Sequence, residues 1–258
     1  MKEYSLGSPL WRSWYDAAFY RSVASVWRAK AVLYLAVLLI GLSIPGLVKI
    51  QVSLHAGMKF FRQKIAAQIP DMTIVKGEVH TPEEKPYVVR LKPGDEPFIV
   101  IDTTGKTQLL SSSGPSILVT RSQILMRKSV TETRIYDLSN VRFFSIDQER
   151  LDAWTQKLEK WLPVFLFPFI EGFWFVSRIL TAVFFALVGL VLVAWLEAEL
   201  HFAALLSLAI VSMTPSLILQ TVLEAGSKHF PYQGLFFFAL SFGYFLFAVN
   251  AATDKMVE

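Results

Sequence analysis

Apolar residues concentrate in two parts of the chain, residues 31–48 and 161–250, and a polar stretch separates them. This stretch, residues 49–160, carries 17 of the 25 Lys and Arg residues and 13 of the 21 Asp and Glu residues. Uncharged apolar runs of about 20 residues are typical of helices that cross the ~30 Å hydrocarbon layer of a membrane. The pattern therefore predicts a membrane helical bundle with a polar domain inserted into it.

The first apolar run predicts the first transmembrane helix, which we place at residues 31–50. Eighteen residues from Ala31 to Val48 carry no charge, and basic residues flank the run on both sides. At a rise of about 1.5 Å per residue, a helix of this length crosses most of the hydrocarbon layer.

The second apolar block, residues 161–252, begins with a long stretch that has only two charged residues, Glu171 and Arg178, before Trp195. Two crossings would need about 40 apolar residues, so this stretch accommodates one. Pro168 suits the first turn of a helix, where its missing N–H has no helical partner in any case. We therefore expect a helix that begins near Pro168 and crosses the membrane at about residues 176–196.

Two further crossings are predicted at about residues 201–220 and 234–251. Thr214 and Pro215 lie within the first of them, and a proline inside a helix removes one backbone hydrogen bond and bends the helix. Together with residues 31–50 and 176–196, these segments predict a membrane α-helical bundle of four transmembrane helices.

The amino-terminal residues 1–30 predict an amphipathic helix that lies on the membrane surface. Ser8 can cap it, and its aromatic residues recur on one side at helical spacing. Trp side chains favour the headgroup region of a bilayer. Packing against other helices is an alternative that is compatible with surface binding. The expected membrane-surface anchors are Trp11, Trp14, Phe19 and Trp27.

The polar insert, residues 51–160, predicts a small α+β domain that is mainly β. Short β-branched and aromatic runs such as "YVVRL" and "VRFFSI" alternate with Pro- and Gly-containing clusters such as "TPEEKP" and "KPGDEP". A helix is expected on each side of these strands. The first ends before Pro70, and Asp147 can cap the second.

Composition narrows the possible functions. The chain has no Cys, which excludes disulfides, thiolate metal sites and cysteine nucleophiles. Its net charge is only +4, and no basic stripe with interleaved aromatic residues indicates a nucleic-acid partner. Five Lys and Arg residues in residues 1–30 favour a cytoplasmic amino terminus. With four crossings, both termini are then cytoplasmic and the insert is extracytoplasmic.

Glu171 and Arg178 are the candidate polar pair of the membrane block. They are seven residues apart, so on a helix they share a face and lie about 10 Å apart along the axis. One interpretation places both at the membrane interface, with the Arg178 side chain extended towards water. The other places them inside the bundle as a functional pair, because charges within a membrane are costly. The interfacial interpretation is the simpler one.

No catalytic or metal-binding constellation is recognisable. Asp102 follows an apolar strand, but an extra Thr precedes Gly105 and no second copy supplies the partner of an aspartic protease dyad. His80 lies near three Glu residues in a loop, without the second His that a zinc site usually has. We expect no enzyme activity, no cofactor and no bound metal.

The order of segments resembles bacterial domain-of-unknown-function family 1189. The resemblance is carried by "SPLW" before an aromatic helix, by "IPDMTIVKGEVHTPEEKPYVV", "FIVIDTTG", "SILVTRSQILMR" and "TRIYDLSNV", and by the closing three-helix block. It covers essentially the whole chain. It implies a multi-pass protein of the bacterial inner membrane with one extracytoplasmic insert, and it supplies no catalytic or ligand-binding residues.

These observations lead to three hypotheses about function. The first is a non-enzymatic accessory protein whose extracytoplasmic domain binds another membrane or extracytoplasmic protein, with the lipid bilayer as its other partner. The second is a component of a transport system that uses Glu171 and Arg178. An intramembrane enzyme is the third, and the sparse polar residues of the membrane block speak against it.

Overall fold

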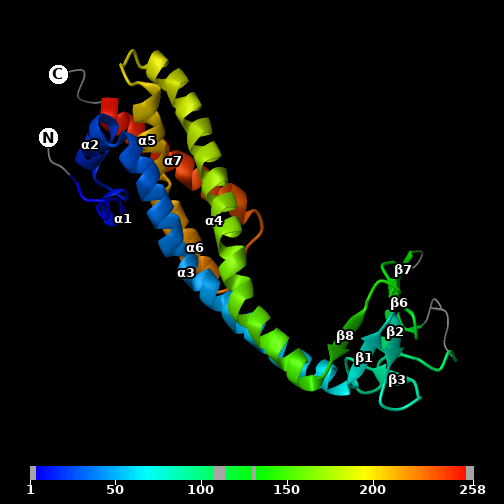
Figure 1. Ribbon diagram of the computed structural model, residues 1–258. Coiled ribbons are helices and arrows are strands. Elements are labelled where there is room, and N and C mark those ends of the chain that lie inside the picture. Colours follow the sequence, from blue (N-terminus) through cyan, green and yellow to red (C-terminus); the bar gives the residue numbers. More distant parts are fainter. Residues whose placement is uncertain (1–3, 107–113, 130–131, 254–258) are drawn as a thin grey trace. The chain divides into compact units, whose positions relative to one another are not determined.

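The structure is a computed structural model that describes residues 4–106, 114–129 and 132–253 (Figure 1). It divides into two compact units. The helical unit consists of residues 1–50 and 164–258, and the insert unit consists of residues 51–163. Two long helices, α3 (Arg28–Phe60) and α4 (Gln148–Trp195), have residues in both units.

Within the described ranges, four helical segments are long and apolar enough to cross a membrane. The first is α3, continued by a π turn η1 (Phe61–Ile65) and a 3₁₀ turn η2 (Ala66–Gln68). The second is α4, and the fourth is α7 (Gln233–Thr253). The third consists of α5 (Phe202–Ser212) and α6 (Thr214–Ala225). Four apolar helices of membrane-spanning length therefore agree with the sequence prediction.

The start of α4 differs from the prediction. A helix was expected to begin near Pro168, after a separate helix, but α4 runs without interruption from Gln148 and contains both Pro163 and Pro168. A proline inside a helix removes one backbone hydrogen bond and crowds the carbonyl four residues before it, which can bend a helix without ending it. The helix therefore continues past them, as α3 continues past Pro45. Asp147 does cap α4, because its Oδ1 accepts the Arg150 N–H at 2.7 Å.

The amino-terminal segment packs into the helical unit. It forms α1 (Pro9–Arg12) and α2 (Ala17–Val26), and α2 packs against α5 and α7. The Arg21 Nε donates to the Ala251 carbonyl at 2.9 Å, and the Tyr20 hydroxyl donates to the Ser13 carbonyl at 2.6 Å. These hydrogen bonds hold α2 to α7 and to the chain that precedes it.

The four expected surface anchors divide into two pairs. Phe19 and Trp27 are fully buried in the core of the helical unit, so they contact protein instead of lipid headgroups. Their positions correspond to the alternative of packing against other helices. Trp11 and Trp14 are 52% and 40% exposed. The helical period identified one apolar side of the segment, and tertiary packing buries only part of that side.

The third apolar segment is divided where Thr214 and Pro215 occur. Pro215 cannot donate to the Val211 carbonyl, and the Met213 N–H donates to it instead. The Thr214 and Tyr34 hydroxyls form a buried hydrogen bond of 2.9 Å between α6 and α3. A second buried hydroxyl contact joins Ser216 of α6 to Ser241 of α7. The break between α5 and α6 thus places two hydroxyls where neighbouring helices supply partners.

The insert unit contains two sheets. The first has the strand order β2-β1-β8, and the second has the order β3-β4-β5-β6-β7. All neighbouring strands are antiparallel except β4 and β5, which pair in parallel with Ile99 opposite Ile117. The strands are β1 (Met72–Val75), β2 (Glu78–His80), β3 (Tyr87–Val89), β4 (Ile99–Ile101), β5 (Ile117–Val119), β6 (Gln123–Arg127), β7 (Thr133–Asp137) and β8 (Phe143–Ile146).

Side chains alternate between two small cores along the central strands of the insert unit. Ile101 and Val119 join one cluster of buried residues, whereas Val100 and Leu118 join another. This alternation is expected for a strand, because successive side chains point to opposite faces. Gly77 makes the β1–β2 turn with a φ of +84°, and a Cβ at this position would lie 2.8 Å from Ser139 Cα.

Gly189 should be essential for close packing in the helical unit. A Cβ on this residue would lie 2.8 Å from Phe245 Cζ and 3.1 Å from Leu205 Cδ2, and both of those side chains are fully buried. Overpacking of this kind costs about 1–3 kcal/mol. Gly189→Leu should therefore lower the thermal unfolding midpoint of the detergent-solubilised protein. Gly172→Leu is the control on the same helix, because a Cβ there meets nothing within 4 Å. Equal losses from both substitutions would contradict this packing.

Candidate functional site

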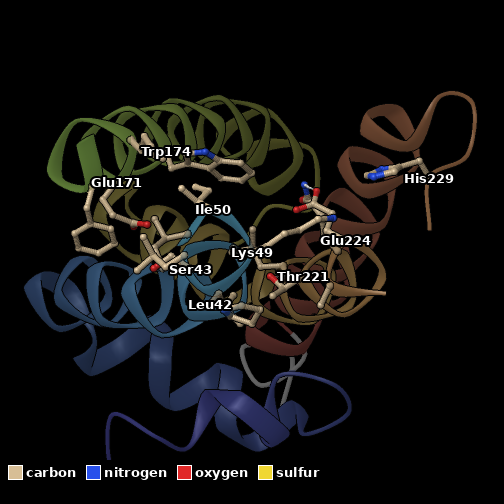
Figure 2. Close-up of a pocket in the computed structure, with 18 residues that line it drawn as sticks. Leu42, Ser43, Lys49, Ile50, Glu171, Trp174, Thr221, Glu224 and His229 are labelled. Carbon is tan, nitrogen blue, oxygen red and sulfur yellow. Dashed lines mark hydrogen bonds between the residues drawn. The ribbon is translucent and has the colours of Figure 1, made fainter. Parts of the chain in front are cut away.

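A cavity of about 400 Å³ lies in the helical unit among α3, α4 and α6 (Figure 2). Most of its lining is apolar. The apolar part of the lining comes from aliphatic residues of α3, α4 and α6 and from aromatic residues of α4. The apolar lining residues with large side chains are Leu39, Leu42, Leu47, Ile50, Phe167, Ile170, Trp174 and Leu217.

Polar side chains interrupt the apolar lining at a few places. They come from all three helices and from the segment that follows α6. They are Ser43 and Lys49 of α3, Glu171 of α4, Gln220, Thr221 and Glu224 of α6, and His229. The view in Figure 2 places Glu171 on one side and Glu224 on the other, with Trp174 and Ile50 between them.

Arg178 lies beside this cavity and is bound to α6. One terminal guanidinium nitrogen donates to Gln220 Oε1 at 3.1 Å, and the Gln220 Nε2 donates to Glu224 Oε1 at 2.8 Å. The guanidinium also lies over the ring of Trp174, 5.2 Å from its centroid. The Arg178 Nε is buried without a hydrogen-bond partner in the described part of the chain. Gln220 therefore bridges the Arg178 guanidinium and the Glu224 carboxylate.

Glu171 is not joined to Arg178. Its half-buried carboxylate lines the cavity, and the described residues provide it with neither a hydrogen bond nor an ion pair. The two residues share a face of α4, as their spacing predicted, but the partners of Arg178 come from another helix. Sequence reasoning missed Gln220 and Glu224. A signal for them exists, because they are four residues apart in the otherwise apolar segment "SLILQTVLEA" and so share one face.

The other candidate residues of the helical unit lie outside the cavity lining. Thr214 and Pro215 are buried at the junction of α5 and α6, where Thr214 binds Tyr34. Trp11 and Trp14 belong to α1 and the segment after it. The sequence thus identified one lining residue, Glu171, and one neighbour of the cavity, Arg178.

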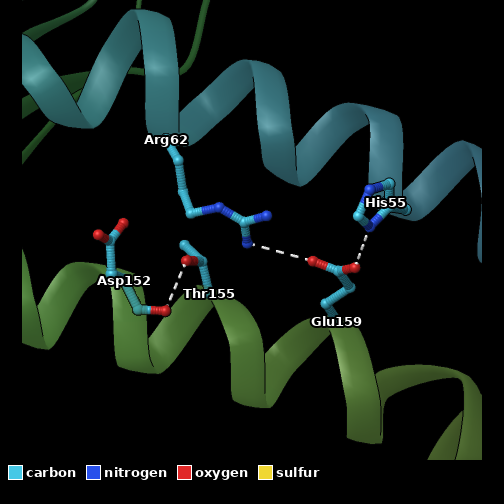
Figure 3. Close-up of polar contacts among 5 residues, drawn as sticks. All are labelled: His55, Arg62, Asp152, Thr155 and Glu159. Carbon is cyan, nitrogen blue, oxygen red and sulfur yellow. Dashed lines mark hydrogen bonds and ion pairs between the residues drawn. The ribbon is translucent and has the colours of Figure 1, made fainter.

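A second polar cluster lies in the insert unit, where α3 with η1 runs beside α4 (Figure 3). The Glu159 carboxylate binds His55 through one oxygen and Arg62 through the other, the latter at 3.1 Å. These contacts hold the pKa of the Glu159 carboxyl below its ordinary value of 4.5, and the hydrogen bond with His55 is the largest cause. Glu159 therefore has cationic or polar partners, whereas Glu171 has none among the described residues.

The residues considered for catalysis or metal binding have structural contacts. Asp102 is buried at the end of β4, and its Oδ1 accepts the Thr104 N–H at 2.9 Å and the Thr104 hydroxyl at 2.6 Å. Near His80, Glu78 pairs with Arg121 at 3.1 Å and Glu83 pairs with Lys85 at 2.6 Å. In the ranges that the structure describes, no three His, Cys, Asp or Glu residues are grouped as metal ligands.

Residues 8–249 match the model of the family described as "Protein of unknown function (DUF1189)". The chain belongs to the DUF1189 family. The matched region includes the cavity, the Arg178 contacts and the Glu159 cluster of this DUF1189 protein. No curated protein and no solved structure matches the chain.

Arg178 should be coupled to Gln220 and not to Glu171. In a double-mutant cycle on the detergent-solubilised DUF1189 protein, Arg178→Met and Gln220→Met should show an interaction energy of about 0.5–3 kcal/mol, since they share a hydrogen bond. The cycle of Arg178→Met with Glu171→Met should be additive within about 0.5 kcal/mol. Thermal or denaturant unfolding supplies the free energies. A larger coupling in the second cycle would contradict this arrangement.

Acid should reduce the contribution of Glu159 to the stability of the folded state. Because the folded pKa lies below the ordinary value of 4.5, ionised Glu159 stabilises the folded state above that pH, and the contribution disappears as the pH falls through the folded pKa. Glu159→Gln should lower the unfolding midpoint at pH 7 and have a smaller effect at pH 4. Circular dichroism can follow the unfolding. Glu84→Gln, at an exposed loop position of the same unit, is the control and should have little effect at either pH.

Proposed function

We propose that this protein is a non-enzymatic component of a membrane transport system, and that its helical unit binds a small molecule in the cavity. One observation supports this function above the others: a mostly apolar cavity with the carboxylates of Glu171 and Glu224 in its lining lies among helices that are apolar enough to cross a membrane. Its volume of about 400 Å³ falls within the ~300–1,000 Å³ that is usual for small-molecule sites. Charged side chains within membrane segments are costly and usually mark a ligand or ion pathway.

The proposal includes no chemical step. General acid–base catalysis requires groups within hydrogen-bond reach of one reacting atom. Glu224 is already bound to Gln220, and Glu171 has no acid or base as a partner in the described ranges. Binding and release are therefore the functions that this cavity supports best.

We further propose that the protein resides in a bacterial inner membrane with both termini in the cytoplasm and residues 51–163 outside it. The five basic residues of the first 30 residues support this orientation. Because the chain has no Cys, single cysteines test it directly. In spheroplasts, Ser122→Cys should react with an impermeant maleimide, and Ser5→Cys should react only after permeabilisation. The reverse pattern would invert the orientation.

A second candidate function is the binding of a partner protein by the insert unit. Strand β7 forms one edge of the five-stranded sheet, and all five of its residues are exposed. Ile135 and Tyr136 are 60% and 46% exposed. An unpaired strand edge can bind an extended segment of another protein through backbone hydrogen bonds. A photo-crosslinking residue at Ile135 should then capture a partner in native membranes, whereas one at Glu84 should not.

Filling the cavity should remove the bound molecule. Thr221 lines the cavity, whereas the adjacent Val222 does not line it and is 61% exposed. Protein with Thr221→Phe should therefore lose a compound that the wild-type protein and the Val222→Phe control retain through purification. Mass spectrometry of the small molecules released on denaturation measures this. The same compounds in equal amounts from all three proteins would contradict binding in the cavity.

A further inference from the structure

We propose that the ligand of this cavity is an amphipathic organic cation, with its ammonium group bound by Glu171 and its apolar part held by the aliphatic and aromatic walls. This inference rests on the proposed binding function and specifies its chemistry. The argument depends on three features of the cavity: the balance of charges, the distribution of apolar surface and the size.

The charges around the cavity have partners with one exception. The Lys49 Nζ donates to the Ser227 hydroxyl at 3.0 Å. Glu224 accepts from Gln220 at 2.8 Å and is attracted electrostatically to Arg178. Of the carboxylates that line the cavity in the described ranges, Glu171 is the one without a hydrogen-bonding or ionic partner. The cavity therefore contains a carboxylate that the described residues leave without a direct partner.

A carboxylate in apolar surroundings is unfavourable unless a cation or hydrogen-bond donors accompany it. A ligand with an ammonium group supplies both, because it is positively charged and has up to three donors. An anionic ligand would be repelled by Glu171 and by Glu224. Lys49 and Arg178 are the cations that could attract it, but the Lys49 ammonium already donates to Ser227 and the Arg178 guanidinium to Gln220. The charge balance thus favours a cation.

The position of Trp174 indicates that its ring contacts the apolar part of the ligand and not the ammonium group. It follows Glu171 by three residues on α4, so both side chains lie on one face of the helix and line the cavity together. The Arg178 guanidinium lies over the Trp174 ring. A second cation stacked on the same ring would be repelled by Arg178, whereas a hydrocarbon chain beside the ring would not. Ile50 and Ile170 extend this apolar surface.

The size of the cavity limits the apolar part. About 400 Å³ is near the lower end of the range for small-molecule sites, which fits a short alkyl or aryl ammonium compound. Two sources can provide this chemistry: a free organic cation, or the ammonium headgroup of a membrane lipid with the first part of its chains. The shared element is an ammonium group next to hydrocarbon.

Calorimetric titration of the full chain in a neutral maltoside detergent tests the inference with three matched probes. Hexylammonium, 1-hexanol and hexanoate have the same hydrocarbon chain and differ in charge. We expect hexylammonium to bind at least tenfold more tightly than the other two, as a hydrogen-bonded ion pair provides. Glu171→Gln should remove this preference, Glu171→Asp should keep part of it, and Glu199→Gln, at an exposed position outside the cavity lining, should leave it unchanged.

The outcomes separate this inference from the function on which it rests. If hexanoate or hexanol binds best and Thr221→Phe abolishes that binding, the cavity is a binding site but the cation inference is wrong. If hexylammonium binds equally well to Glu171→Gln, the role of Glu171 is wrong. If no probe binds in a manner that Thr221→Phe abolishes, both proposals fail. Thermal unfolding of each variant checks that the loss of binding does not reflect loss of the fold.

Lipid nanodiscs distinguish the two sources of the ligand. Hexylammonium affinity is measured for the wild-type protein and for Glu171→Gln, in phosphatidylethanolamine and in phosphatidylglycerol. The wild-type to variant ratio is then compared between the two lipids, because the surface charge of a lipid affects both proteins equally and cancels in the ratio. A ratio that falls in phosphatidylethanolamine indicates that the lipid headgroup competes for Glu171. An equal ratio above one in both lipids indicates a free organic cation. A ratio of one in both would overturn the inference.

Discussion

The arrangement of the helical unit depends on the need to satisfy polar groups inside an apolar bundle. Where water is absent, a hydroxyl or amide must find its partner on the protein. Ser207 of α5 donates to the Trp27 carbonyl at 2.7 Å, which ties the end of α2 to α5. Tyr34 and Thr214 join α3 to α6, and Ser216 and Ser241 join α6 to α7. Each contact selects one pairing of helices among many that apolar packing alone would allow.

Local patterns in the sequence predict most of the elements and few of their contacts. Uncharged runs identify the helices, and short β-branched runs identify the strands, because both signals depend on residues close together in the chain. Pro168 was misleading, because the rule that places proline in a first turn is a preference and a proline can also lie inside a continuous helix, as it does in α4. The burial of Phe19 and Trp27 could not be predicted, since it depends on where α5 and α7 lie.

The same limit applies to the candidate site. The cost of a charge among apolar residues singled out Glu171 and Arg178, which are a lining residue and a neighbour of the cavity. Their spacing on one helix suggested that they interact with each other. The partner of Arg178 is instead Gln220, 42 positions along the chain. A guanidinium can donate to an amide and lie over an indole ring at the same time, which a lysine ammonium on its flexible stem does less well.

Two glutamates of α4, Glu159 and Glu171, have different surroundings. The difference distinguishes a carboxylate that stabilises the fold from one that is a candidate for ligand binding. Glu159 has His55 and Arg62 on its two oxygens, so its charge contributes to the pairing of α3 and α4 within the insert unit. Glu171 has no such contacts among the described residues, although it faces a cavity with mostly apolar walls. Replacing Glu171 by an apolar residue would remove a cost and break no described contact. A charge that costs free energy and makes no described contact in the fold supports the proposal of a partner from outside the chain, and its sign favours a cation.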